Sequence, residues 1–287
     1  MVSISIVTYK TDLAELRKCL ASLMSETIGK IYIIDNSRED YLKEFCKEYS
    51  IAQYIASENI GYGAAHNIAI KASIAAGSQY HLVLNSDVYF EPNVIEKLIE
   101  YMENPKNRDV AMVQPNIIYP NGRLQYTCRL LPTPANLIFR RFFPKRLFVR
   151  MNNRYMLKFN DHKKEMNVPN HQGSFMFFRI SCFGKVGLFD ERFFMYAEDI
   201  DITRRVHKYF RTMFYPNVTI VHAHRAASYK NKKMLKIHIR NVIKYFNKWG
   251  WLFDKERSSW NKELLDELEY NKKTVSAKKA CSDQWLQ

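Results

Sequence analysis

The stretch NIGYGAAHNIAIKASIAAGSQYHLVLNSD, residues 59–87, joins two glycines, an alanine-rich segment and a short apolar run that ends on an acidic side chain. Gly61 and Gly63 allow a tight turn, and the alanines after them favour a helix. Residues 80–87, YHLVLNSD, then have the composition of a buried strand. A helix followed at once by a buried strand is the repeating unit of an α/β protein, so this stretch sets the expectation for the N-terminal half.

The same alternation continues on both sides of this stretch. Apolar, β-branched runs predict further strands, and periodic leucines after Asp12 and apolar residues after Pro92 predict helices between them. The expected strands are SISIVTYK (3–10), KIYIIDNS (30–37), QYIAS (53–57) and DVAMVQP (109–115). This pattern predicts an α/β fold with a Rossmann-like, mostly parallel central sheet and helices on both faces. Ligands bind beyond the carboxyl ends of such strands, so Tyr9, Asp35, Asn59 and Asp87 should converge on one crevice.

The second half is less regular. Asn121-Gly122 predicts a hairpin, whereas residues 132–168 are basic, aromatic and weakly periodic. Beyond them we expect strands at 173–180, 212–216 and 218–224, a helix at 197–209, and a basic amphipathic helix at 232–249. The tail at 271–287 is polar and lysine-rich, and we expect it to be disordered.

Composition limits the class of protein. The 287 residues are 47% hydrophobic and 25% charged, with a net charge of +15 concentrated in residues 139–164 and 204–280. Such a charge favours polyanionic partners: nucleic acid, anionic lipid or phosphorylated substrates. Zinc-finger spacing and aromatic RNA-binding motifs are absent from the sequence, and so is an apolar run long enough to span a membrane. The N-terminus resembles a first strand rather than a signal peptide, and five scattered cysteines indicate no disulfide framework, so we expect a cytoplasmic protein.

Asn85 and Asp87 end the strand at 80–87. A lone aspartate there is often a turn or cap residue. A carboxylate and a neutral oxygen two residues apart on an extended chain can also share a hard divalent cation with substrate phosphates. Gly61 and Gly63 also have two interpretations: a tight turn, or an anion-binding site at the start of a helix. The segment is not the dinucleotide-binding glycine motif, because His66 stands where that motif has its third glycine.

Two further signals follow. Glu198 and Asp199 begin an expected helix, where acidic residues serve as caps. The aromatic residues just before them predict a partly dry site, in which a carboxylate can have a raised pKa and act as a general base. His222 and His224 lie on one side of a strand end, as ordinary strand residues or as ligands.

These signals occur together and in order, and with them the chain resembles the family 2 glycosyltransferases of the GT-A fold, particularly bacterial rhamnosyltransferase-like members. The resemblance covers roughly residues 2–250. The matching segments are SIVTYK, IIDNS, NIGYGAAHN, LNSDVYF, GSFMFFRI, VGLFDERFFMYAEDIDITRRV and VHAHRAASYK.

The resemblance implies a role for each matching residue. Asp199 would be the catalytic base that deprotonates the acceptor hydroxyl. Asp87 would be the metal-binding carboxylate of the family's DxD motif, in which Asn85 replaces the first aspartate, with Mg²⁺ or Mn²⁺ as cofactor. His222 or His224 would complete the metal shell or contact the diphosphate, His222 being slightly preferred. The donor-binding residues would be Thr8, Tyr9, Asp35, Asn59, Gly61, Asn67, Asn85 and Ser86, and the acceptor-binding residues Gly173, Ser174, Tyr196 and Glu198.

The implied reaction is an inverting, metal-dependent transfer of a sugar, with rhamnose as the candidate, from a dTDP- or UDP-linked donor in cell-surface polysaccharide synthesis. The acceptor would be a saccharide, with a lipid diphosphate carrier left open, and we expect no nucleic-acid partner. The expected organisation is a catalytic domain at 1–230, with a nucleotide-sugar half at 1–115 and an acceptor half at 116–230, and a helical extension at 231–270. The mixture of Lys/Arg with Phe/Trp in 139–150 and 232–253 suits attachment to the inner face of a bacterial membrane, although the apolar stripe of the 232–249 helix could instead pack on the domain.

Two other functions stay open. A sugar-phosphate nucleotidyltransferase would also use an α/β nucleotide domain, but it needs a glycine-rich basic loop after the first strand, which SIVTYKTDLAEL lacks. A non-enzymatic nucleic-acid-binding protein would use the basic half and would not depend on Asp199.

Overall fold

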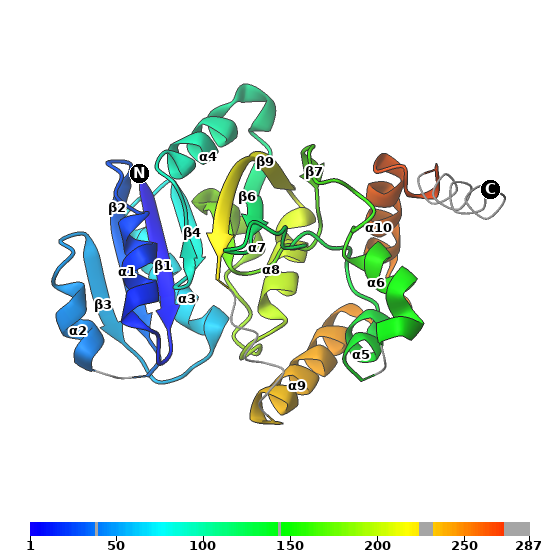
Figure 1. Ribbon diagram of the computed structural model, residues 1–287, viewed down its shortest axis with the longest axis horizontal. Helices are drawn as coiled ribbons and strands as arrows, with labels where there is room; N and C mark the ends of the chain where they lie inside the picture. Colours follow the sequence, from blue (N-terminus) through cyan, green and yellow to red (C-terminus); the bar gives the residue numbers. More distant parts are fainter. Residues whose placement is uncertain (38–39, 143–144, 224–231, 273–287) are drawn as a thin grey trace.

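The computed structural model describes residues 1–37, 40–142, 145–223 and 232–272 (Figure 1). In these residues a single mixed sheet has the strand order β3-β2-β1-β4-β8-β6-β9-β5, and β7 pairs with β9. The first four strands are parallel and in the predicted places: β1 (Val2–Thr8), β2 (Ile28–Asp35), β3 (Ala52–Ala56) and β4 (Tyr80–Asn85).

The second half extends the sheet with strands of both directions. β8 (Phe175–Arg179) is antiparallel to β4 and β6 (Val110–Ile118), and β9 (Arg211–His222) runs parallel to β6. The short β5 (Val88–Tyr89) and β7 (Met166–Asn167) both pair antiparallel with β9. The prediction of two strands around Pro216 was wrong, because β9 continues through a register shift opposite Pro115 and Asn116.

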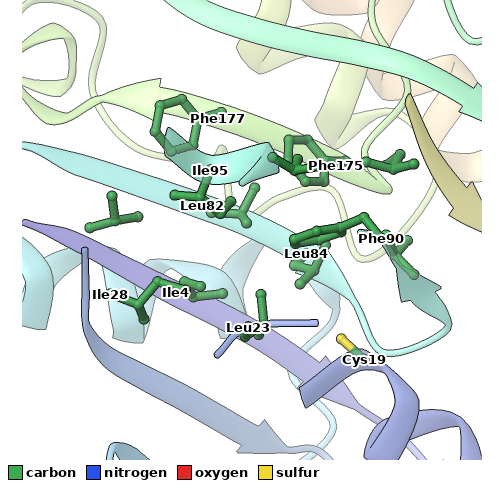
Figure 2. Close-up of a cluster of buried hydrophobic side chains, with 14 of the residues drawn as sticks. Ile4, Cys19, Leu23, Ile28, Leu82, Leu84, Phe90, Ile95, Phe175 and Phe177 are labelled. Atoms are coloured by element: carbon green, nitrogen blue, oxygen red, sulfur yellow. The ribbon is translucent and has the colours of Figure 1, made fainter. Parts of the chain in front are cut away.

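Helices cover both faces of the sheet, as predicted. On one face α1 (Leu13–Ala21), α2 (Asp40–Cys46) and α4 (Val94–Glu103) bury leucines, isoleucines and Phe45 against the strands. Figure 2 shows part of this cluster, in which Leu82 and Leu84 of β4 lie beside Phe175 and Phe177 of β8. The opposite face is covered by α3 (Tyr62–Ala75), α7 (Phe183–Val186) and α8 (Glu198–His207).

Individual sequence signals explain several element boundaries. Asp12 caps α1 by accepting a hydrogen bond from the backbone N–H of Ala14 at 2.8 Å. Gly122 has a positive φ of 78° in the predicted hairpin turn, although the returning strand is reduced to one bridge between Ile118 and Leu124.

The remaining helices lie in the second half of the chain. The weakly periodic region contains α5 (Pro134–Phe142), η2 (Lys145–Phe148) and α6 (Val149–Tyr155), which the sequence did not predict. Two short 3₁₀ turns complete this part: η1 (Pro105–Asn107) precedes β6, and η3 (Ile180–Cys182) follows β8. The C-terminal extension comprises α9 (Lys232–Trp249) and α10 (Lys255–Glu267).

The amphipathic helix α9 packs on the domain. Val242, Tyr245 and Phe246 are buried with Phe193 and Ile200, next to the start of α8. The apolar stripe of the 232–249 helix therefore faces inward over its C-terminal half. No helix in the described ranges combines the length and apolarity needed to cross a membrane. The proposed boundary at 115/116 falls inside β6, and the division into halves stays a prediction.

Candidate active site

The first cluster of predicted residues lies where β1 and β2 end. Asp35 is fully buried and accepts hydrogen bonds from Ser37 N–H at 2.9 Å and from the Tyr54 hydroxyl at 3.1 Å. The hydroxyl of Thr8 lies 3.3 Å from the same carboxylate. Tyr9, by contrast, is 55% exposed at the strand end. Asp35 is thus held in place by its neighbours, whereas the Tyr9 ring is open to solvent; binding of a donor by this cluster stays a prediction.

Both glycines of the NIGYGAAHN segment are required by close packing with the chain itself. Gly61 has a φ of +99°, and a Cβ there would lie 2.5 Å from the carbonyl oxygen of Phe194. A Cβ on Gly63 would lie 2.9 Å from Cβ of Phe189. The Tyr62 N–H donates to the Phe194 carbonyl at 2.9 Å. The close approach that the sequence suggested is therefore made by the 189–194 loop.

Asn67 holds the same loop. Its amide donates to the carbonyl of Phe189 at 2.9 Å and to Glu191 at 3.0 Å, and it accepts from the Phe189 N–H at 2.9 Å. Asn67 is 2% exposed, so these contacts use both of its donors. The structure gives Asn67 a positioning role, and direct contact with a donor stays a prediction.

Asp87 and His222 meet across the β5–β9 pair. His222 Nε2 lies 3.3 Å from Asp87 Oδ1, because Val88 and His222 are partners in the antiparallel register. Gln125 fixes the imidazole from behind: its amide donates to the His222 carbonyl at 2.6 Å, and its Oε1 lies 3.0 Å from His222 Nδ1. With an N–H at Nδ1 donating to Gln125, the Nε2 lone pair would be free to bind a cation placed between His222 and Asp87.

These two side chains fit a divalent cation that is shared with a ligand. A carboxylate oxygen and an imidazole nitrogen suit Mn²⁺, and the carboxylate suits Mg²⁺. The described residues contain no cluster of three or more His, Cys, Asp or Glu that could hold a metal alone. A cation held by Asp87 and His222 would need water or phosphate oxygens as its further ligands. Asn85 and Ser86 lie half-buried beside Asp87, and His224 lies outside the described residues.

Tyr62, which the sequence analysis did not single out, lies between the cation side and the base side of the site. Its hydroxyl is 2.9 Å from Asn85 Oδ1 and 2.7 Å from the carbonyl oxygen of Gly173. Burial raises the pKa of Tyr62 well above its usual value, and the charges of Glu198, Asp199 and Asp87 raise it further. The hydroxyl therefore stays protonated and joins Asn85 to the segment that holds Asp199.

Asp199 is anchored by backbone donors at the start of α8. Its Oδ2 accepts from Gly173 N–H at 3.1 Å and its Oδ1 from Ile200 N–H at 2.8 Å. Gly173 allows this approach, because a Cβ there would lie 3.2 Å from Asp199 Cβ. Its neighbour Glu198 is 5% exposed and accepts from the Ala197 N–H at 2.8 Å.

The two carboxyl groups differ in their ability to hold charge. Burial raises the pKa of Glu198 well above its usual range, and the Asp199 charge adds to the rise. Burial also raises the pKa of Asp199, but the guanidinium of Arg129 and the backbone donors lower it. Asp199 therefore holds a negative charge more readily than Glu198, and a general base needs that property.

Arg129 is a second site residue that the sequence analysis missed. It is half-buried, its backbone N–H bonds the Asn170 carbonyl at 3.0 Å, and its Nε is buried with no hydrogen-bond partner in the described part of the chain. Only its electrostatic effect on the pKa of Asp199 reveals it, because a single arginine in a basic sequence carries no signal.

Tyr196 and Ser174 complete the surroundings of the carboxylates. Tyr196 has a positive φ of 80°, which is costly for a tyrosine, and its ring meets His238 of α9 edge to face at 5.2 Å. The Ser174 carbonyl accepts from Asn85 N–H at 2.9 Å, and its hydroxyl is buried without a partner among the described residues. The acceptor roles of Gly173, Ser174, Tyr196 and Glu198 stay predictions.

Helix α9 holds the loop that leads to these carboxylates. Asn241 donates to the Met195 carbonyl at 2.7 Å, and Lys244 donates to the Arg192 carbonyl at 2.6 Å. One turn later, Lys248 lies 2.8 Å from Asp190. The C-terminal extension is thus part of the frame that positions Tyr196, Glu198 and Asp199.

The chain is similar to known glycosyltransferases in sequence and in fold. The family model described as Glycosyl transferase family 2 matches residues 3–187. The chain is 26% identical over 232 residues to "Rhamnosyltransferase WbbL" of Escherichia coli K12, covering 75% of this chain and 81% of that protein. It is 28% identical over 240 residues to "N-acetylglucosaminyl-diphospho-decaprenol L-rhamnosyltransferase" of Mycobacterium tuberculosis H37Rv, covering 77% of this chain and 75% of that protein.

Solved glycosyltransferase structures share the fold. GalNAc-T7 with UDP, GalNAc and Mn²⁺ superposes with a TM-score of 0.61 at 16% identity, over 95% of this chain and 57% of that one. The mannosyltransferase PcManGT of Pyrobaculum calidifontis, with GDP-Man and Mn²⁺, gives 0.54 at 14% identity, over 85% of this chain and 64% of that one. The chain thus spans less than two thirds of these solved structures, and the expected GT-A architecture is confirmed.

Proposed function

The chain belongs to glycosyl transferase family 2, and from this premise we propose that it moves a sugar, with rhamnose as the candidate, from a nucleoside diphosphate donor to a saccharide hydroxyl with inversion at the anomeric carbon. The observation that carries the proposal is the position of Tyr62, whose hydroxyl lies between Asn85 on the cation side and Gly173 on the base side. One ionised base opposite one diphosphate site supports a single displacement at the anomeric carbon. A route through a covalent glycosyl-enzyme would need a second carboxylate as nucleophile, and the single displacement does not.

In this reaction Asp199 accepts the proton of the acceptor hydroxyl. The hydroxyl oxygen forms its bond to the anomeric carbon as the bond between that carbon and the diphosphate oxygen breaks. Gly173 and Ile200 hold the carboxylate by their N–H groups, so its orientation is set before the substrate arrives. Glu198 is buried and Asp199 is half-buried, so the aromatic residues beside them limit the access of water to the base.

The nucleoside diphosphate leaves as an anion, so its negative charge has to be stabilised. Asp87 and His222 would hold the cation, and Gln125 keeps the His222 ring in the ligating orientation. A divalent cation bound there would neutralise charge on the departing diphosphate. Support for the cation comes from the donor set and from Mn²⁺ in the two solved structures named above; both Mg²⁺ and Mn²⁺ suit the carboxylate.

Thr8, Tyr9 and Asp35 are proposed to receive the nucleoside, with dTDP or UDP as the nucleotide. The supporting facts are the exposed ring of Tyr9 and the ordered carboxylate of Asp35 at neighbouring strand ends. We infer a saccharide on a lipid diphosphate as acceptor, and catalysis at the inner surface of an anionic membrane. This is supported by the name of the mycobacterial relative and by the net charge of +15.

The test is transfer from dTDP-rhamnose and UDP-sugars to N-acetylglucosaminyl diphosphate on a short alkyl chain, with Mn²⁺ or Mg²⁺. Asp199→Asn should lower kcat by at least about 100-fold while nucleotide binding survives. Asp87→Ala should abolish the metal-dependent part of nucleotide binding. Full activity of Asp199→Asn, or retained metal-dependent affinity in Asp87→Ala, would contradict the assignment.

A further inference from the structure

The outward face of α9 differs from the face that packs on the domain. Ile239 and Ile243 are one helical turn apart and both are exposed, at 36% and 42%. The helix carries six lysines and arginines and no acidic residue. Lys244 and Lys248 are used inward, whereas Lys236 and Arg240 lie exposed on the same side as the two isoleucines.

Beyond α9 the chain turns through three exposed apolar side chains. Trp251, Leu252 and Phe253 are 37%, 77% and 96% exposed, just before Asp254 caps α10. Trp251 donates its indole N–H to Asn247 at 2.8 Å. Asn247 follows Ile243 by one helical turn, so the line Ile239, Ile243 and Asn247 continues into the turn.

The turn is built to keep this shape. The Arg257 guanidinium lies 3.2 Å from the carbonyl oxygens of both Trp251 and Leu252 and 3.4 Å from that of Gly250. Gly250 has a φ of 96°, and a Cβ there would lie 2.8 Å from the Phe253 carbonyl. Exposing the apolar side chains of Leu252 and Phe253 to water is unfavourable. Burying them in a nonaqueous environment would remove this cost.

This surface lies on the catalytic side of the molecule. In Figure 1 the arrows of β1 and β9 point toward the side on which α9 lies. A groove of about 400 Å³ separates α9 from the active-site loops, and its lining includes Ile237, Arg240 and Asn241 on one wall and Asn59 and Phe194 on the other. Phe194 is the residue whose carbonyl meets Tyr62.

We propose that this surface, formed by Lys236, Ile239, Arg240, Ile243 and the turn 251–253, docks on an anionic phospholipid bilayer. Leu252 and Phe253 enter the boundary between headgroups and acyl chains, Trp251 lies at headgroup level, and the cations meet lipid phosphates. The groove then opens toward the membrane surface, within reach of a substrate diphosphate carried on a lipid. The surface assignment deepens the proposed function, but the binding itself needs neither donor nor acceptor.

The experiment is cosedimentation of the full chain with phosphatidylcholine vesicles, with and without phosphatidylglycerol, at low and high salt. We expect binding to the anionic vesicles only, and release by high salt. The double variant Leu252→Ser/Phe253→Ser and the double variant Lys236→Glu/Arg240→Glu should each weaken binding by more than about tenfold.

Matched controls are exposed residues elsewhere on the described surface. Met24→Ser/Ile74→Ser removes two exposed apolar side chains, and Lys18→Glu/Lys97→Glu makes the same charge change; both should bind as the unsubstituted chain does. The proposal is overturned by equal binding to neutral vesicles, by equal losses in the controls, or by a Leu252→Ser/Phe253→Ser variant that converts a dimer into a monomer, since a second copy would then cover the surface.

Transfer to the short-chain acceptor separates this inference from the proposed function. The Leu252→Ser/Phe253→Ser variant should keep the unsubstituted kcat with that acceptor, because neither residue lines the groove. A chain that transfers sugar but ignores vesicles overturns the docking surface alone. A chain that binds vesicles and transfers no sugar supports the surface and contradicts the proposed activity.

Discussion

His222 Nε2 lies 3.3 Å from the Asp87 carboxylate, while the opposite side of the ring faces Gln125. The two residues are 135 positions apart in the chain and become neighbours only because β5 pairs with β9. Gln125 contacts both the ring and the backbone of His222, so the imidazole has one orientation before any ligand binds.

Gln125→Leu should therefore weaken Mn²⁺-dependent binding of a nucleoside diphosphate by about 10- to 100-fold, because Nδ1 loses its acceptor and the ring is no longer held. Isothermal titration of the nucleotide, with and without Mn²⁺, measures this. Gln125→Glu keeps an acceptor for Nδ1 but loses the donor to the His222 carbonyl, so it should restore only part of the affinity. Unchanged affinity in Gln125→Leu would remove His222 from the cation site.

Arg129→Gln should move the acid limb of the kcat/KM profile to higher pH. Asp199 must be ionised to accept a proton, so activity falls as pH drops through its pKa. Burial raises the pKa of Asp199, and the charge of Arg129 lowers it. Without Arg129 the pKa of Asp199 should therefore be higher. Arg123→Gln, at an exposed position in the hairpin turn, is the control and should leave the profile in place. A shift to lower pH in Arg129→Gln would contradict this account.

Gly61→Ala should reduce both stability and transfer, because the new Cβ meets the Phe194 carbonyl and the backbone has a φ of +99°. Two other glycines separate these causes. Gly77 has a φ of +69° and open space around it, so Gly77→Ala should cost about 1–2 kcal/mol without loss of activity. Gly184, with open space and no positive φ, should accept alanine at no cost. Thermal unfolding and kcat, measured for all three variants, test the order.

Asp254→Asn should destabilise the protein by about 3–5 kcal/mol. The Arg204 guanidinium makes two 2.7 Å hydrogen bonds to Asp254, and both side chains are 2% exposed. Neutralising Asp254 leaves the buried cation with Glu256, at 3.2 Å, as its remaining carboxylate partner among the described residues. The surface pair of Arg17 and Glu48 is the control, since Glu48→Gln should not change the denaturation midpoint measurably. Equal denaturation midpoints for the two variants would show that the buried pair stabilises the protein no more than the surface pair does.

Part of the site could be read from the sequence because local patterns encode it. The strand ends at Asp35 and Asp87, the glycines after Asn59 and the acidic helix start at Glu198 follow from hydrophobic period and turn chemistry. The sequence did not show which contacts the two glycines make possible. They make room for the 189–194 loop, which is more than 120 residues away in the chain.

The sequence by itself determined the α/β order, the covered parallel strands and the family resemblance, because each rests on short-range periodicity and on motif order. Only the tertiary structure decided that His222 faces Asp87, that Tyr62 joins the two sides of the site and that Arg129 acts on Asp199. It also decided that α9 turns Val242 and Phe246 inward and leaves Ile239 and Ile243 outside. Helical period fixes only which residues share a face, and which face is buried depends on the partners that the rest of the chain brings to it.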